Sequence, residues 1–223
     1  RLGFTRRTRF FGQDILMPSP HGIQAVVAAV DLTADGVADL VTTGRSGPTT
    51  WLEVRVNDGH GVFGPPQEFE PSIGDPPMLE TLDANGDEKP DLIGVQIGTT
   101  SDAEIRVYHN EGAGKFTRRT MIAAGPLLSA AIGDLDGDGR DDIAEVALEG
   151  TSVSLRWRRN QGEWAFAPPV TLIDLPRGTG AAATHGVTML DADGDGKNDL
   201  LLASGSSASV RLFRNQGEPL PTF

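Results

Sequence analysis

The sequence contains no cysteine among its 223 residues, so it offers neither a disulfide framework nor thiol chemistry. No apolar run approaches the roughly 18 residues that a transmembrane helix needs, and we expect no membrane span. A sustained period of 3.6 residues is also missing, which excludes a solenoid of helical repeats. The H-E-x-x-H, G-x-S-x-G and Walker patterns are absent, and the four histidines stand in dissimilar contexts, so we expect no enzyme active site.

Basic residues are few. The chain has 19 Lys and Arg against 31 Asp and Glu, which gives a formal net charge of −12. This balance argues against nucleic-acid binding, because such binding depends on a basic surface. The excess of acid is concentrated in one short phrase that recurs along the chain.

The acidic phrase occurs four times, at residues 31–39, 83–91, 134–142 and 191–199. Each copy reads D-x-(D/N/T)-x-D-(G)-x-x-D, and successive copies begin 52, 51 and 57 residues apart. A nearly fixed period of this length is typical of a repeat architecture and argues against separate domains. We therefore treat residues 1–223 as a single domain.

The spacing of the oxygen-bearing residues predicts calcium binding. Carboxylates this close repel one another unless a cation neutralises them, and calcium takes about six to eight oxygen ligands. An ordinary solvated Asp-Gly turn is the alternative for a single copy, but four copies in register favour a metal site. We predict up to four Ca²⁺ ions, held by the side chains at positions 1, 3, 5 and 9 and the backbone carbonyl at position 7: Asp31, Thr33, Asp35, Val37 and Asp39; Asp83, Asn85, Asp87, Lys89 and Asp91; Asp134, Asp136, Asp138, Arg140 and Asp142; Asp191, Asp193, Asp195, Lys197 and Asp199.

The four sites should differ in strength. The loops that begin at Asp134 and Asp191 carry four aspartates each and should bind best. Thr33 weakens the first loop. In the second loop, Asn85 replaces an aspartate and Glu88 replaces the glycine that permits a positive φ, so we expect this loop to be strained.

An EF-hand is the rival interpretation of the third loop, because Glu145 falls at position 12 after Asp134. EF-hands need flanking helices. The flanks of all four loops are short runs of small or β-branched residues that end at Gly or Ser, which indicates buried strands. We therefore interpret the EF-hand match as a coincidence.

A second signal follows each acidic phrase: a strand that ends in asparagine, at residues 57, 110, 160 and 215. The residues five and three places before the asparagine are apolar and the one between them is charged, a period of two that indicates a strand with one packed face. The charged residue is arginine in three copies, and we expect these arginines to form a solvated or inter-blade face. An Asn-x-Gly turn and a further strand complete the repeat. Four antiparallel strands in about 52 residues make one propeller blade.

We therefore predict an all-β fold, a β-propeller of four-stranded antiparallel blades with units at about 23–72, 77–124, 127–174 and 183–215. The last unit lacks an outer strand, and residues 3–10 resemble the outer strand of another unit. An N-terminal strand would thus close the last blade and remove an unpaired edge. The alternative is one arc of a larger ring. Because the chain starts at Arg1 rather than Met, we expect it to be a processed or excised segment.

These residues resemble the FG-GAP/VCBS repeats, which also occur in the integrin alpha-subunit propeller and in some fungal lectins. The resemblance covers nearly the whole chain, and its most specific part is D-x-D-G-D-G-x-x-D, intact in the third and fourth repeats. It implies a structural calcium ion in the hairpin between the first two strands of each blade. Family members mostly serve as extracellular adhesion or carbohydrate-binding modules, and some polysaccharide lyases look similar.

The expected function is a calcium-stabilised module, extracellular or at the cell surface, that binds a glycan or a protein. Weak calcium sites are useful only where calcium is millimolar, which indicates a secreted protein. Two alternatives remain open: a structural or assembly subunit of a larger cell-surface complex, and a polysaccharide lyase. Trp51 and Trp164 lie near loops and are candidates for stacking on sugars, whereas Trp157 takes a core position in its strand.

Overall fold

A computed structural model describes residues 23–47, 49–73, 78–97, 103–150, 152–176, 185–204 and 208–217. These residues form fifteen β-strands and no α-helix. They contain no helix with the length and hydrophobicity that a membrane crossing requires. The predicted all-β class is therefore confirmed. The predicted N-terminal strand at residues 3–10 lies outside the described residues.

The strands form four antiparallel sheets, one for each repeat, and within each sheet every strand pairs with its neighbour in sequence. Sheets 1 to 3 have four strands each and sheet 4 has three among the described residues. Sheet 1 comprises β1 (Ile23–Val30), β2 (Asp39–Ser46), β3 (Thr49–Arg55) and β4 (Gln67–Ile73); sheet 2 comprises β5 (Met78–Leu82), β6 (Asp91–Val95), β7 (Glu104–Gly112) and β8 (Lys115–Ala123); sheet 3 comprises β9 (Leu127–Gly133), β10 (Asp142–Glu149), β11 (Ser152–Arg158) and β12 (Val170–Pro176); sheet 4 comprises β13 (His185–Leu190), β14 (Asp199–Ser204) and β15 (Ser209–Phe213).

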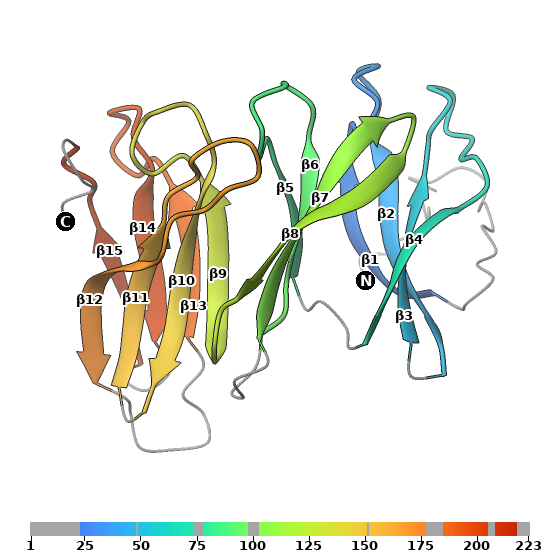
Figure 1. The fold of residues 1–223 in the computed structure, drawn as a ribbon. Coiled ribbons are helices and arrows are strands. Elements are labelled where there is room, and N and C mark those ends of the chain that lie inside the picture. The colour runs from blue at the N-terminus through green and yellow to red at the C-terminus, as the bar shows by residue number, and fades with distance from the viewer. Residues whose placement is uncertain are drawn as a thin grey trace, which may run out of the picture.

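The four sheets follow one another as a row in the order of the sequence; in Figure 1, sheet 1 is at the right, sheet 2 in the middle, and sheets 3 and 4 overlap at the left. Their first strands contact one another in series, with β1 against β5, β5 against β9 and β9 against β13. The described strands of sheet 1 make no extensive contact with those of sheet 4, so the described residues do not form a closed ring. The loops that join the first two strands of each sheet all lie at the top of the sheets in Figure 1.

Hydrophobic contacts between neighbouring sheets hold the row together. The apolar pairs predicted on the third strands face the following sheet: Leu52 of β3 packs in one cluster with Leu92 of sheet 2, and Leu155 of β11 packs in another with Leu200 of sheet 4. A third cluster joins sheets 2 and 3. Side chains of a strand alternate between its two faces, so the two apolar residues of each third strand lie on the same face of their sheet.

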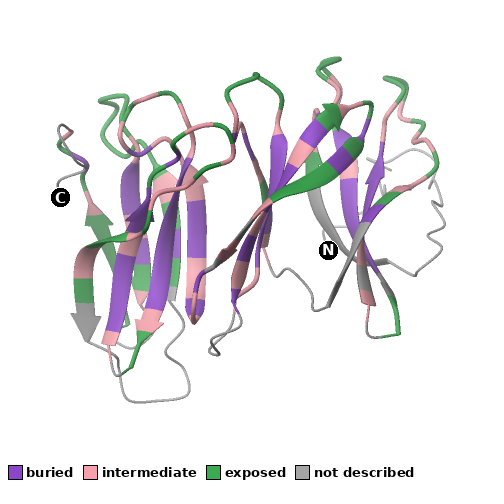
Figure 2. Cartoon of the chain, viewed as in Figure 1, coloured by how far each residue is buried: buried purple, intermediate pink, exposed green. Residues whose placement is uncertain are grey.

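The last sheet breaks this pattern. Its apolar pair, Val210 and Leu212, has the same register as the buried pairs of sheets 1 to 3, yet these side chains are 64% and 42% exposed. Most of β15 is therefore coloured as exposed in Figure 2. Sheet 4 presents an apolar face that no described residue covers.

This difference gives a prediction for stability. Leu155→Ala should lower the free energy of unfolding by about 2–5 kcal/mol, because Leu155 is fully buried and the change leaves a cavity. Leu212→Ala should cost less than about 1 kcal/mol, because the Leu212 side chain already meets solvent. Urea denaturation of both variants measures the difference. Equal costs would contradict the open face and would mean that another sheet covers β15 in solution, as a closed ring requires.

Candidate metal centres

The four acidic phrases form the loops between the first and second strands of the sheets, at the top of the sheets in Figure 1. We number them loops 1 to 4 in sequence order. In each loop the backbone curls around the first aspartate. In loop 3, the Asp134 carboxylate accepts the N–H groups of Gly137 at 2.8 Å, Asp138 at 3.2 Å and Gly139 at 2.8 Å. Loop 4 repeats this arrangement around Asp191, with distances of 2.7, 3.2 and 2.9 Å.

This curl requires a positive φ at two positions, the fourth and the sixth. Loop 3 supplies Gly137 and Gly139, with φ of +77° and +83°. Loop 2 has Glu88 at the sixth position with φ of +63°, so the predicted strain in its backbone is confirmed. Loop 1 has Ala34 at the fourth position with φ of +59°. The need for a positive φ at the fourth position was not part of the sequence prediction, although three of the four loops have glycine there.

Loops 3 and 4 bring three carboxylates together. In each, carboxylate oxygens of the first, third and fifth positions lie within 4.8 Å of one another: Asp134, Asp136 and Asp138 in loop 3, and Asp191, Asp193 and Asp195 in loop 4. We call these groups the carboxylate trios. Three hard oxygen donors on a curled loop fit a calcium ion, whose ligand geometry is flexible. Loops 1 and 2 offer two carboxylates each at these positions, because Thr33 and Asn85 take the third place.

Electrostatics within loop 3 also favour a cation. Burial raises the pKa of the Asp136 carboxyl, and the nearby Asp138 carboxylate raises it further. In loop 4 the ammonium group of Lys197 holds the pKa of the exposed Asp195 below its usual value. The Asp136 carboxyl is therefore harder to ionise than an ordinary aspartate, although the Arg159 guanidinium partly offsets the rise in its pKa.

The seventh-position residues, Val37, Lys89, Arg140 and Lys197, do not place a side chain on the trio as a ligand. Each donates its backbone N–H to the aspartate two places earlier, at 2.9 to 3.0 Å. The three basic side chains also pair with that same aspartate. Ligation by their backbone carbonyls stays a prediction.

The ninth-position aspartates have a structural task that sequence reasoning missed. All four side chains are buried, and each carboxylate connects the loop to the Asn-x-Gly hairpin of the same sheet. One oxygen accepts the N–H of the loop's second residue, and the other accepts the N–H of the hairpin asparagine. The two distances are 2.9 and 2.9 Å for Asp39, 3.3 and 2.7 Å for Asp91, 3.3 and 2.7 Å for Asp142, and 3.1 and 2.8 Å for Asp199.

We call this arrangement the aspartate bridge. A carboxylate oxygen has two lone pairs, so a bridge does not prevent the same group from also meeting a metal, and that part of the prediction is untested. In loop 3, Asp142 additionally accepts the indole N–H of Trp157 at 2.9 Å. Burial raises the pKa of Asp142 to about 6, so this carboxyl is mostly ionised at neutral pH. The repeated asparagine was the available sequence signal for the bridge.

Hydrogen bonds also connect successive loops. The side-chain amide of Asn110 donates to the Leu32 carbonyl of loop 1 at 2.8 Å, and that of Asn215 donates to the Leu135 carbonyl of loop 3 at 2.7 Å. Asn198 of loop 4 donates to the Asp134 carbonyl at 2.8 Å. The loop ends of sheets 1 and 2, and those of sheets 3 and 4, are therefore in direct contact.

The structure confirms that the EF-hand match is a coincidence. Glu145 lies within β10, fully buried, and not on a helix. Its carboxylate pairs with Arg158 and, at 2.7 Å, with Arg156. Arg156 also donates to the carbonyl of Ala124, directly after β8 of sheet 2, at 3.2 Å, so this member of the predicted arginine row does lie between sheets.

Other candidate binding features are less suited to a ligand. Trp157 is buried, as predicted. The Trp164 ring is flanked by the guanidinium of Arg119, at 5.3 Å, and the ring of His109, at 4.9 Å, and it packs against the core of sheets 2 and 3. Trp51 is partly buried in β3.

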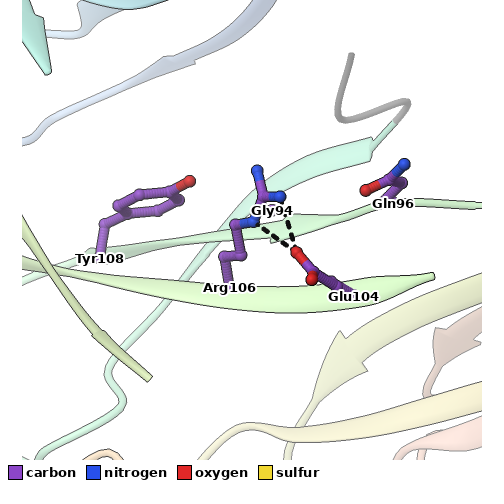
Figure 3. Close-up of a pocket in the computed structure, with 5 residues that line it drawn as sticks. All are labelled: Gly94, Gln96, Glu104, Arg106 and Tyr108. Atoms are coloured by element: carbon purple, nitrogen blue, oxygen red, sulfur yellow. Dashed lines mark hydrogen bonds and ion pairs between the residues drawn. The ribbon is translucent and has the colours of Figure 1, made fainter. Parts of the chain in front are cut away.

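A small recess lies on sheet 2, lined by Gly94, Gln96, Glu104, Arg106 and Tyr108 (Figure 3). Arg106 donates to one oxygen of Glu104 through two nitrogens, at 3.0 and 2.7 Å, and this pair leaves the recess without a strong net charge. The recess is therefore a poorer candidate for a ligand-binding site than the carboxylate trios are.

Comparison with known proteins agrees with this geometry. A family model described as an FG-GAP-like repeat matches residues 83–145 and 134–202, and these segments together cover more than half of the chain. No curated protein sequence matches significantly. The structure is similar to that of a lectin from Agrocybe aegerita described as recognising non-reducing terminal N-acetylglucosamine, with a TM-score of 0.53 and 20% identity over 84% of this chain. The chain spans about half of that lectin, 51% of its length, and the likeness shows the fold alone. On the match to the repeat model, this chain belongs to the FG-GAP-like repeat family.

Proposed function

We propose that this protein is a calcium-stabilised, non-enzymatic binding module. The observation that carries the proposal is the pair of carboxylate trios on repeated, glycine-curled loops. Calcium bound there would neutralise carboxylates that otherwise repel one another and would tie the first two strands of each sheet together. Asp134, Asp136 and Asp138 would hold one ion and Asp191, Asp193 and Asp195 another, with weaker sites at loops 1 and 2.

The sheets are, in this proposal, successive blades of a β-propeller. The packing of each sheet on the next and the uncovered apolar face of sheet 4 support it, because a ring would place a further blade against Val210 and Leu212. Residues 3–10 would supply the outer strand of the last blade. Closure into four blades and continuation into a larger ring both satisfy this packing.

The proposed partner is a glycan. A binding module of this kind could also take a protein surface as its partner. The fold likeness to a lectin supports the glycan form. Weak calcium sites function only in millimolar calcium, so the module would operate outside the cell or on its surface.

A glycan array probed with the labelled protein tests this function. We expect selective binding in millimolar calcium to at least one glycan class, and weaker binding in EGTA because loss of the ions lowers the stability of the module. Arrays should include glycans that end in N-acetylglucosamine, given the described specificity of the lectin. Absence of binding to every glycan class in calcium would contradict the glycan form.

A second candidate is a subunit of a larger assembly. The exposed apolar side chains Val210 and Leu212 favour it, because such a face can dock against another chain. Sedimentation analysis distinguishes the two functions. Defined oligomers without glycan binding would support assembly, whereas a monomer that binds a glycan would support the binding module.

A further inference from the structure

Arginine side chains occupy the carboxylate trio of loop 3. The Nε atom of Arg159 lies 2.6 Å from an oxygen of Asp136, and its Nη2 atom lies 3.0 Å from an oxygen of Asp138. Arg140 pairs with the same oxygen of Asp138. Two of the three carboxylates that would bind a metal therefore already have guanidinium partners.

The backbone positions Arg159 for this contact. Arg159 directly precedes Asn160, whose N–H is held at 2.7 Å by the buried Asp142 of loop 3. The aspartate bridge thus anchors the hairpin beside the loop, and the Arg159 side chain reaches across to the trio. This route depends on the tertiary structure, because Arg159 and Asp136 are far apart in sequence.

The other loops show how specific this contact is. The equivalent residue of loop 4 is Arg214, whose Nε lies 3.8 Å from Asp193 and makes a looser ion pair. In loops 1 and 2 the equivalent residues are Val56 and His109, and His109 meets the ninth-position Asp91 instead of a trio. Loops 3 and 4 share the same D-x-D-G-D-G-x-x-D signature but differ in their arginine contacts.

A guanidinium and a calcium ion satisfy the same need. Each neutralises crowded carboxylates, and each requires their oxygens. The two cations repel each other at this range, so calcium binding in loop 3 is opposed unless the Arg159 guanidinium moves away from the trio. In loop 4 the equivalent contact, that of Arg214, is already long. The Lys197–Asp195 pair of loop 4, at 2.9 Å, corresponds to the Arg140–Asp138 pair of loop 3, so the two loops differ mainly at the arginine before the hairpin asparagine.

We propose that Arg159 is a built-in counter-ion that competes with calcium in loop 3, so that loop 3 binds calcium more weakly than loop 4 despite an identical motif. The inference rests on the proposed calcium function. It means that loop 3 keeps its shape at low calcium and that calcium binding releases a charged side chain at the surface, where 47% of the Arg159 side chain is already exposed.

Two glycine amides report on the two loops separately. The N–H of Gly139 donates to Asp134 in loop 3 at 2.8 Å, and the N–H of Gly196 donates to Asp191 in loop 4 at 2.9 Å. Both amide resonances should shift when the first aspartate takes up calcium. Glycine-selective ¹⁵N labelling of the full chain and a calcium titration followed by NMR give one midpoint for each loop.

In the unmodified protein we expect Gly196 to titrate at a lower calcium concentration than Gly139. In Arg159→Gln, the Gly139 midpoint should move to lower calcium by roughly 1.5- to 5-fold, the range expected for loss of a partly exposed ion pair, while the Gly196 midpoint stays in place. The matched control is Arg119→Gln. Arg119 has a similar side-chain exposure, 44%, but pairs with Glu111 at 3.8 Å, outside the trios. This control should move neither midpoint.

The results distinguish failure of the proposed arginine competition from failure of the proposed calcium function. If the glycines respond to calcium but the Gly139 midpoint of Arg159→Gln is unchanged or higher, the competition is disproved and the calcium function stands. A midpoint for Gly139 below that of Gly196 in the unmodified protein also overturns the inference. If neither glycine responds to millimolar calcium, the calcium function itself fails and the inference fails with it.

Discussion

Chelation of calcium with EGTA is expected to lower the melting temperature of this protein by roughly 6–12 °C. A site filled at tenfold its dissociation constant adds about 1.4 kcal/mol to the free energy of unfolding, so loops 3 and 4 together add about 3 kcal/mol. For a chain of this size, 1 kcal/mol corresponds to about 2–4 °C. Filling of loops 1 and 2 as well would raise the total to roughly 5–6 kcal/mol and the shift accordingly. Differential scanning calorimetry in calcium and in EGTA measures the effect.

The control for this experiment removes one metal-binding carboxylate from each trio instead of removing the ion. A double variant, Asp138→Asn with Asp195→Asn, loses one carboxylate from each trio and should show a much smaller difference between calcium and EGTA. Magnesium should restore less stability than calcium, because it prefers stricter octahedral geometry and retains its water. Superimposable melting curves of the unmodified protein in calcium and EGTA would refute the calcium function.

Replacement of a bridge aspartate should be costly even without metal. In EGTA at neutral pH, Asp142→Ala is expected to lower the free energy of unfolding by about 3–5 kcal/mol. The change removes the acceptor for three buried donors, namely the N–H groups of Leu135 and Asn160 and the indole N–H of Trp157. Each buried donor left without a partner costs about 1–3 kcal/mol, and these costs are not fully additive. Urea denaturation measures the loss.

The matched change in a trio separates the bridge from metal ligation. Asp193→Ala in loop 4 removes an aspartate of the same motif whose side chain is 33% exposed. In EGTA it should cost less than about 1 kcal/mol, because no buried donor depends on it. In calcium its cost should grow, since it removes a ligand. Equal losses for Asp142→Ala and Asp193→Ala in EGTA would contradict a structural role for the bridge.

Local spacing was enough to predict the repeats and their strands. The D-x-D-G-D-G-x-x-D phrase and the Asn-x-Gly turn each lie within a single hairpin. The glycines of both motifs adopt a positive φ because the local turn requires it. The period of two on the third strands likewise follows from strand geometry. For the same reason, the strain at Glu88 and the irrelevance of the EF-hand match were predictable from sequence.

Contacts between distant residues were not predictable in this way. The aspartate bridge joins Asp142 to Asn160, and the trio of loop 3 meets Arg159 only because that bridge holds the hairpin in place. Asn215 of sheet 4 reaches the Leu135 carbonyl of loop 3. No pattern of spacing encodes which of two lone pairs a carboxylate uses or which side chain fills a gap.

The sequence by itself determined a four-fold β repeat with acidic loops, because each of those features depends on neighbours within a few residues. The tertiary structure alone decided that the ninth-position aspartates are buried as bridges, that the arginine contacts are closer in loop 3 than in loop 4, and that no described residue covers the apolar face of sheet 4. These outcomes depend on how one sheet packs against the next, and burial and pairing exist only once that packing is made.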